Sequence, residues 1–215
     1  MLNAAEREAV DARVAAIEAA TGTEVVTAVI GKADAYPELP WTAFAAGASL
    51  AALGTVVAAA LRPAWAVADG TLLAATTILG AGGACALTAV FVPAFARLFL
   101  RDARRDLEVG QYARSLFLER ELFRTRGRIG ILLLVSLFER RVELLADTGF
   151  DGRIGAGEWA RVVARMTPRL VAGDPGAALL EGLAGLEEAL ARAGFRAAAH
   201  DVNELPDPPV EATGE

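Results

Sequence analysis

The sequence has almost none of the residues from which proteins build disulfides and zinc sites. Cys85 is its only cysteine and His200 its only histidine, so one chain cannot form a disulfide or a zinc site made of these residues. Lysine is nearly absent as well, since Lys32 is the only one among 21 basic residues. The formal net charge of -6 argues against nucleic acid as a partner, because phosphate backbones are bound by basic surfaces.

Two long stretches contain no charged residue at all. The first covers 21 residues from Trp41 to Leu61, and the second covers 27 residues from Gly70 to Ala96. A helix needs about 20 apolar residues to cross the hydrocarbon core of a bilayer, so each stretch is long enough for one crossing. The alternative is a pair of buried, alanine-rich helices in a soluble protein. We predict a transmembrane helical hairpin over residues 41–96, which makes the lipid bilayer itself a partner.

The distribution of arginine predicts how the hairpin is oriented. Only Arg62 lies in the short loop between the apolar stretches, whereas four arginines follow the second one: Arg97, Arg101, Arg104 and Arg105. Positive charge is retained on the cytoplasmic side of membranes, so both termini of this multi-pass chain are expected in the cytoplasm. The excess of arginine over lysine, with abundant alanine and glycine, is typical of GC-rich bacterial genomes. The membrane would then be a bacterial inner membrane.

Small residues line parts of both apolar stretches. They include Gly47 and Gly54 in the first, and Gly80, Gly82 and Gly83 in the second. Small residues let helix backbones approach closely in lipid, which would allow homo-oligomer formation through these faces. The low side-chain volume of an alanine-rich chain explains them equally well.

The charged remainder of the chain predicts an α/β domain. Asn3 and Glu6 have the spacing of a capping box at the start of a helix that Gly22 ends. Buried strands are expected where short apolar runs lie between turn residues, and helices where apolar residues recur every three or four positions. The expected strands are Glu24–Ile30, Ile129–Ser136 and, antiparallel to the second, Arg141–Asp147; the expected later helices are Asp102–Phe123, Gly155–Val171 and Asp174–Ala193.

These elements predict one domain that the hairpin interrupts. Residues 1–40 would form its first part and residues 97–200 its second part, with the hairpin at 41–96 between them. The first turns of the helix from Asp102 are expected to prolong the second membrane helix. Residues 201–215, rich in proline and acidic residues, are expected to form a flexible acidic tail.

Candidate binding residues lie at the ends of the expected strands. The carboxylates of Glu24, Asp147 and Asp151 could supply oxygen ligands to Ca²⁺ or Mg²⁺ if the fold brings them together. Arg126 and Arg128 flank a glycine before a buried strand and could bind a phosphate or carboxylate. The alternative is that these carboxylates and arginines form ordinary ion pairs. The sequence predicts no required cofactor, no metal site of recognised spacing and no catalytic residue.

Several of these segments together resemble the TPM domain family. They are Thr21 to Val26 after an opening helix, Arg126 to Ser136, Glu139 to Gly149, and Trp159 in the next helix. The order of these elements, with a two-helix hairpin after the first strand, is similar to that of a bacterial membrane-anchored subgroup of the family. The C-terminal segment from Asn203 to Asp207 is also similar to the tail of that subgroup. The resemblance implies a small α/β sandwich interrupted by the transmembrane hairpin.

The resemblance also implies a function and a partner. Members of the family support or regulate membrane protein complexes, and bacterial members are frequently encoded beside LemA-like membrane proteins. A membrane-anchored accessory or scaffold protein with a cytoplasmic TPM domain is therefore the expected function, with a LemA-like protein as a candidate partner. A weak divalent-metal-dependent phosphatase is the alternative, because phosphatase activity and calcium binding are attributed to some plant relatives.

Overall fold

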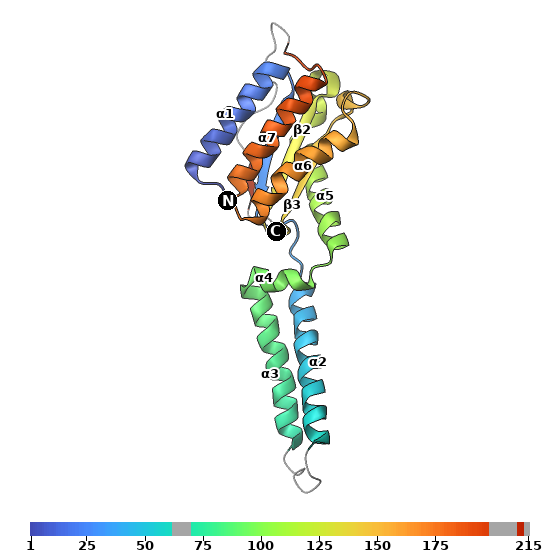
Figure 1. Ribbon diagram of the computed structural model, residues 1–215. Helices are drawn as coiled ribbons and strands as arrows, with labels where there is room; N and C mark the ends of the chain where they lie inside the picture. Colours follow the sequence, from blue (N-terminus) through green and yellow to red (C-terminus); the bar gives the residue numbers. More distant parts are fainter. Residues whose placement is uncertain (62–69, 198–209, 213–215) are drawn as a thin grey trace. The chain divides into compact units, whose positions relative to one another are not determined.

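The computed structural model describes residues 1–61, 70–197 and 210–212, and the chain divides into two compact units. Residues 1–34 and 103–215 belong to the first, which we call the α/β unit. Residues 35–102 belong to the second, which we call the hairpin unit. Figure 1 labels the helices and strands of both.

The first helix, α1 (Ala4–Thr21), begins and ends as its sequence predicts. Asn3 Oδ1 accepts a hydrogen bond from Glu6 N at 2.9 Å, and Glu6 Oε2 accepts one from Asn3 N at 2.7 Å, which confirms the capping box. The helix ends at Gly22, whose φ of 69° lies in the left-handed region that glycine adopts without strain. The structure buries four residues of α1 at helical spacing: Val10, Val14, Ile17 and Thr21.

Four strands form one sheet in the order β3-β2-β1-β4. β1 (Glu24–Ile30) and β2 (Gly130–Ser136) pair in parallel over their full length, and β3 (Arg141–Ala146) pairs antiparallel with β2, as predicted. β4 (Val210–Ala212) pairs in parallel with Ala28 to Ile30 of β1. This strand lies within the segment expected to be a flexible tail, and residues 201–209 and 213–215 of that segment lie outside the described part.

Helices cover both faces of this sheet, which confirms the predicted α/β architecture (Figure 1). One face packs against α1, α6 (Ala156–Val171) and α7 (Pro175–Arg192). The other packs against α5 (Asp102–Glu119). All seven residues of β2 are buried, and full burial of a Leu, Ile or Val side chain contributes about 1.5–3 kcal/mol to the free energy of unfolding.

The sequence prediction for α5 is confirmed at its first residue, Asp102, but was wrong at its last residue and in its expected continuity with the preceding long helix. Its helix stops at Glu119 instead of Phe123, because Glu121 takes a left-handed φ of 53° and the short 3₁₀ helix η3 (Leu122–Arg124) follows. It also does not prolong α3 (Gly70–Phe91), since Val92 and Leu100 are both extended. Between these two breaks lie the short helices α4 (Pro93–Ala96) and η2 (Arg97–Phe99), which agrees with a kink at Pro93.

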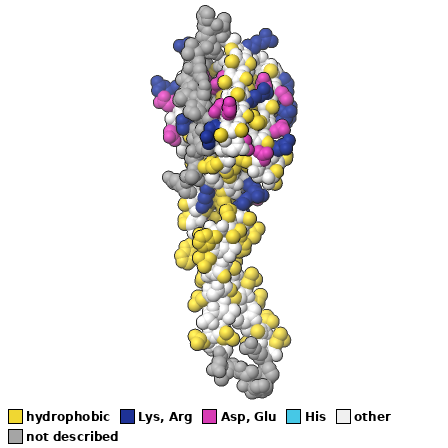
Figure 2. Space-filling view, turned by 90° about the vertical axis from the view of Figure 1, so that its left-hand side faces the viewer, with side chains coloured by type: hydrophobic (Ala, Val, Ile, Leu, Met, Phe, Trp, Pro, Cys, Tyr) yellow, Lys and Arg dark blue, Asp and Glu magenta, His cyan; other side chains and the backbone are white. Residues whose placement is uncertain are grey.

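The hairpin unit consists mainly of α2 (Glu38–Ala60) and α3. Both helices are long and apolar enough to span a membrane, and only 11% of the most apolar window of each is buried. Figure 2 shows hydrophobic side chains along the surface of this unit. The connecting loop, residues 62–69, lies outside the described residues.

The two long helices approach each other closely at only some of the glycines named from the sequence. A Cβ added at Gly47 would lie 2.6 Å from Cys85 Sγ, and one added at Gly82 would lie 2.8 Å from the ring of Phe44. At Gly54, Gly80 and Gly83, an added Cβ would meet no described atom within 4 Å. Close helix approach therefore depends on Gly47 and Gly82.

The chain leaves and re-enters the α/β unit at two points that an ion pair joins. Asp34 Oδ2 lies 3.0 Å from the Arg104 guanidinium, although 70 residues separate the two in the sequence. The segment before Asp34 is also held, because Ala33 N donates to Glu139 Oε1 at 2.9 Å. Glu139 is fully buried and accepts a hydrogen bond from Ser136 Oγ. These contacts fix the chain at the carboxyl end of β1.

A half-buried carboxylate on β3 faces charged residues of α5. Burial raises the pKa of Glu143 above its ordinary value of 4.5, with a smaller contribution from Asp106, while Arg114 opposes the shift. A carboxyl group with a raised pKa in the folded state binds protons more readily there than in the unfolded chain. Its ionisation therefore lowers the free energy of unfolding as the pH rises above 4.5.

We expect Glu143→Gln to make the free energy of unfolding less dependent on pH. The variant should be more stable than the unmodified protein at pH 7.5, and this difference should shrink as the pH falls to 4.5 and below, where Glu143 is protonated in both states. Urea unfolding followed by circular dichroism at several pH values measures the difference. Glu181→Gln, which removes an exposed partner of Arg169, is the control, and a difference that grows with falling pH would contradict the prediction.

Candidate functional site

A pocket with a volume of about 370 Å³ lies at one end of the sheet. It is bounded by the start of β1 at Glu24, by Ile129 just before β2, and by the segment from Thr125 to Gly127. The loop after β3 contributes Gly149, and the segment after α7 contributes Gly194 to Arg196. Parallel pairing of β1 and β2 brings their amino ends together, so segments that are far apart in the sequence meet at this edge.

Glycine lets two loops of the pocket wall approach each other closely. A Cβ added at Gly149 would clash with the carbonyl oxygens of Gly127 and Arg128. Gly127 itself has a φ of 74°, inside the 3₁₀ segment η4 (Arg126–Arg128). Thr125 supports this segment, because its Oγ1 accepts a hydrogen bond from Ile129 N at 3.0 Å. The backbones of the two loops therefore pack directly against each other in this wall, and there is no space for a side chain at position 149.

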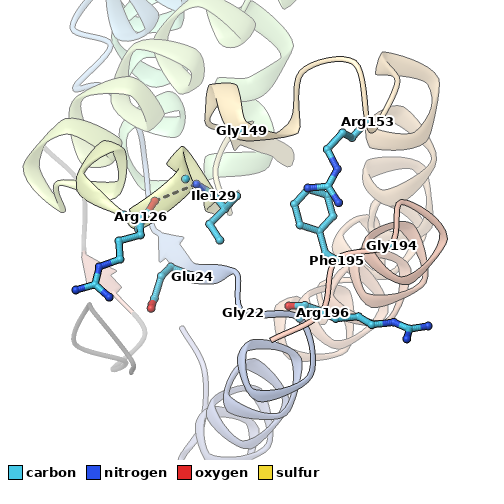
Figure 3. Close-up of a pocket in the computed structure, with 12 residues that line it drawn as sticks. Gly22, Glu24, Arg126, Ile129, Gly149, Arg153, Gly194, Phe195 and Arg196 are labelled. Carbon is cyan, nitrogen blue, oxygen red and sulfur yellow. Dashed lines mark hydrogen bonds between the residues drawn. The ribbon is translucent and has the colours of Figure 1, made fainter. Parts of the chain in front are cut away.

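Three arginines and one glutamate give the pocket its charge. The arginines are Arg126, Arg153 and Arg196, and the glutamate is Glu24, which is only 9% exposed. Figure 3 shows Arg126 and Arg196 on opposite sides of the pocket with their guanidinium groups directed away from each other. Positive charge is therefore spread along the rim, and the buried carboxylate lies between the arginines.

Arg153 is held in place by an aromatic side chain. Its guanidinium carbon lies 3.6 Å from the centroid of the Phe195 ring, and one of its nitrogens donates to Ala193 O at 3.2 Å. Phe195 is buried and packs on Phe150 with the ring centroids 4.9 Å apart. A guanidinium group that is already stacked on a buried ring loses little further conformational entropy when it binds a ligand.

The fold of the α/β unit agrees with what comparison with known proteins shows. A family model described as the TPM domain matches residues 88–189, just under half of the chain. The chain contains a TPM domain. A search of curated proteins found no match. The NMR structure of the BA42 protein from the psychrophilic bacterium Bizionia argentinensis is similar in fold, with a TM-score of 0.59 and 13% sequence identity over 98% of this chain and 95% of that one.

The structure places the sequence-predicted site residues in three environments. Glu24 and Arg126 line the pocket together. Arg128 instead forms an ion pair with the buried Asp147, with Arg128 Nε 2.8 Å from Asp147 Oδ2. Asp151 is exposed and does not line the pocket. Arg128, predicted to bind an anion, and Asp147, predicted to bind a metal ion, therefore neutralise each other beside the pocket.

The predicted metal ligands do not form a cluster in the described part of the chain. Within it, no group of three or more His, Cys, Asp or Glu residues is placed to hold a metal ion. Asp147 Oδ1 accepts a hydrogen bond from Thr148 N at 2.8 Å, where it begins the 3₁₀ helix η5 (Thr148–Phe150). Its carboxylate therefore has a structural partner on each oxygen.

Sequence reasoning missed Arg153, Phe195 and Arg196. Arg153 lies in the loop before α6, and the other two follow the end of α7. None belongs to a motif with characteristic spacing, and only the tertiary fold brings them to the strand ends. One signal was available, since Gly152 and Gly194 precede Arg153 and Phe195 and mark tight turns next to these residues.

Gly149→Ala should destabilise the TPM domain by about 2–3 kcal/mol, because the new methyl group must displace two backbone carbonyl groups. Chemical denaturation monitored by circular dichroism measures the loss. Gly157→Ala is the matched control, because an added Cβ there meets no described atom within 4 Å and alanine favours a helix over glycine. Equal stability of the Gly149 variant and the unmodified protein would show that this loop contact is not close in solution.

Proposed function

We propose that this chain is a membrane-anchored accessory or scaffold protein of the bacterial inner membrane. In this proposal α2 and α3 cross the membrane and the TPM domain lies in the cytoplasm, where it supports or regulates a membrane protein complex. The proposal depends on one observation above all, namely the exposed apolar surface of the two long helices.

That surface has the wrong composition for contact with water. Eight Leu and Val side chains of α2 and α3 are between 58% and 77% exposed: Leu50, Leu53, Val56, Leu72, Leu73, Leu79, Leu87 and Val90. A core helix of a soluble protein buries such residues, and each 100 Å² of apolar surface left in water forgoes about 2.5 kcal/mol. Lipid tails provide an apolar surrounding and, because the helices satisfy their own backbone hydrogen bonds, require no polar partner.

Charge outside the helices supports the proposed orientation. The arginines at positions 97, 101, 104 and 105 follow α3, whereas the loop between the helices contains one arginine. Trp41 lies near the start of α2 and is 74% exposed, as is typical of tryptophan at a membrane interface. Both ends of the chain would then face the cytoplasm.

An accessory role is favoured over catalysis by the residue content of the chain. A serine nucleophile needs a neighbouring base, and Ser136 Oγ donates to the buried Glu139 within the core. The single histidine and single cysteine provide no further nucleophile and base pair. As the partner we propose a membrane protein, with a LemA-like protein as the first candidate.

Single-cysteine labelling in intact cells tests the topology. In a Cys85→Ala background, cysteines introduced at Ala12 in α1 and at Ala191 in α7, both exposed positions, should resist a membrane-impermeant maleimide. A cysteine introduced at Ala66 should react, and all three should react after permeabilisation. Labelling of Ala12 and Ala191 variants in intact cells, or recovery of the protein in the soluble fraction, would contradict the proposed anchoring.

Affinity purification in a mild detergent tests the accessory role. The tagged protein should bring down at least one membrane protein in a stable ratio, and a variant with polar substitutions at Leu53 and Leu72 should lose it together with membrane location. Mass spectrometry identifies the partner. Repeated recovery of the protein alone, from native expression levels and several detergents, would count against the proposal.

A further inference from the structure

The chain changes direction sharply where α3 ends. Val92 has an extended backbone, with φ of -118° and ψ of 94°, and Pro93 begins α4, which η2 continues. Within the hairpin unit, α4 runs across the end of α3 instead of continuing along its axis (Figure 1), and both short helices contact α2. We call residues 93–101 the crossing segment, because its helices lie across one end of the hairpin.

The crossing segment uses only one of its sides for packing. Ala96 and Leu100 are buried, whereas Leu98 between them is 76% exposed. Phe91, the last residue of α3, is 77% exposed. Large apolar side chains with this exposure are unfavourable in water, so the outer side of the segment requires an apolar surrounding.

Aromatic residues gather at the same end of the hairpin. Figure 1 shows the start of α2 beside the end of α3 and α4. Over residues 35–61 and 70–102, the aromatic residues lie either before the third turn of α2 or from the end of α3 onward: Tyr36, Trp41, Phe44, Phe91, Phe95 and Phe99. A band of aromatic residues is typical of the level where a membrane protein passes from hydrocarbon to lipid head groups.

The charge at this end of the hairpin is positive. From residue 70 to residue 101 the sequence contains two basic residues, Arg97 and Arg101, and no acidic one. Arg97 Nε donates to Pro93 O at 3.1 Å. Arg101 is exposed, and within the described residues of the hairpin unit it forms no ion pair, whereas Arg104 pairs with two carboxylates of the α/β unit. The guanidinium donors of Arg101 are therefore open to a ligand from outside the chain.

The length of α3 places this end at the surface of a bilayer. The helix has 22 residues, and at about 1.5 Å per residue it spans about 33 Å. The hydrocarbon core of a bilayer is about 30 Å thick. If α3 crosses the membrane, the break at Val92 comes where hydrocarbon gives way to head groups, and the crossing segment lies in that layer.

We propose that the crossing segment lies parallel to the membrane surface, at the level of the head groups, and binds anionic phospholipids. Leu98 and the Phe95 ring face the acyl chains, and the Arg101 side chain reaches outward to lipid phosphate groups. A long basic side chain can extend along apolar surface and keep its charged end in the polar layer. Its planar guanidinium group binds phosphate oxygens with two parallel hydrogen bonds.

An anionic lipid surface accounts for both the apolar and the charged residues of this segment. A free phosphate ion would bind Arg101 but leave Leu98 and Phe91 in water. An apolar protein surface would cover the leucine but leave the arginine without an anion. Phospholipid supplies acyl chains and phosphate groups at successive depths, and an interfacial amphipathic segment buries its apolar side about 5–10 Å into this boundary.

The inference rests on the proposed membrane anchoring, and one experiment separates the two. In a Cys85→Ala background, a nitroxide spin label is attached to a single cysteine at Leu79 in α3, at Leu98, or at Ala191 in α7. The full chain is placed in vesicles of equal parts phosphatidylcholine and phosphatidylglycerol. Electron paramagnetic resonance then measures how often each label collides with oxygen, which concentrates in hydrocarbon, and with a water-soluble nickel chelate. The label at Leu79 should favour oxygen, the label at Ala191 should favour nickel, and the label at Leu98 should lie between them.

Each contrary result has its own signature. Nickel access at Leu79 equal to that at Ala191 would contradict the anchoring, and the inference with it. Nickel access at Leu98 equal to that at Ala191, with Leu79 protected, would overturn the inference and leave the anchoring intact. Protection of Leu98 from both reagents would show that protein covers the segment, and oxygen access equal to that at Leu79 would place it deep in hydrocarbon; both would overturn the inference.

Lipid selectivity is measured on the purified full chain in detergent. After incubation with equal amounts of the two lipids, native mass spectrometry should show at least about threefold more bound phosphatidylglycerol than phosphatidylcholine, because basic residues attract anionic head groups. Arg101→Gln should lower this ratio about twofold or more, whereas Arg101→Lys, which keeps the charge, should retain most of it. Arg161→Gln on α6 removes the same charge from another surface and is the control. Equal binding of the two lipids, an unchanged ratio in Arg101→Gln, or an equal loss in the control would overturn the inference.

Discussion

The α/β unit depends on the parallel pairing of β1 with β2. β1 is buried over six of its seven residues, so it requires a strand on each side and helices on both faces. Its main partner, β2, lies beyond the hairpin unit, and 99 residues separate the end of β1 from the start of β2. Any arrangement that separated residues 1–34 from residues 103–215 would leave the apolar faces and backbone groups of both strands without partners.

The same pairing creates the pocket. Because β1 and β2 run in parallel, the segments that precede them, from Thr21 to Thr23 and from Thr125 to Ile129, meet at one edge of the sheet. The antiparallel β3 ends at that edge and delivers the loop containing Gly149. The position of the site is therefore a result of strand direction, and its charge is a result of the residues that the loops and the end of α7 bring to it.

Much of this architecture is predictable from sequence because it depends on local patterns. The capping box at Asn3 and the apolar runs of β1 and β2 identify their elements directly. The end of α5 was not predictable, since Glu121 adopts a left-handed conformation that its residue type does not favour. The pocket was predictable only in part: Glu24 and Arg126 adjoin predicted strands, whereas Arg153 and Arg196 reach it through tertiary packing alone.

The ion pair between Asp34 and Arg104 has a consequence for how the gene could have acquired its hairpin. The two side chains that bracket residues 35–102 lie within 3.0 Å of each other, so an uninterrupted chain needs only a short connection at this point. The entropy of loop closure grows slowly with length, and a long insertion between such neighbouring ends adds little to it. The α/β unit can thus exchange the whole intervening segment for a brief turn, or a turn for a new segment, and keep the same sheet.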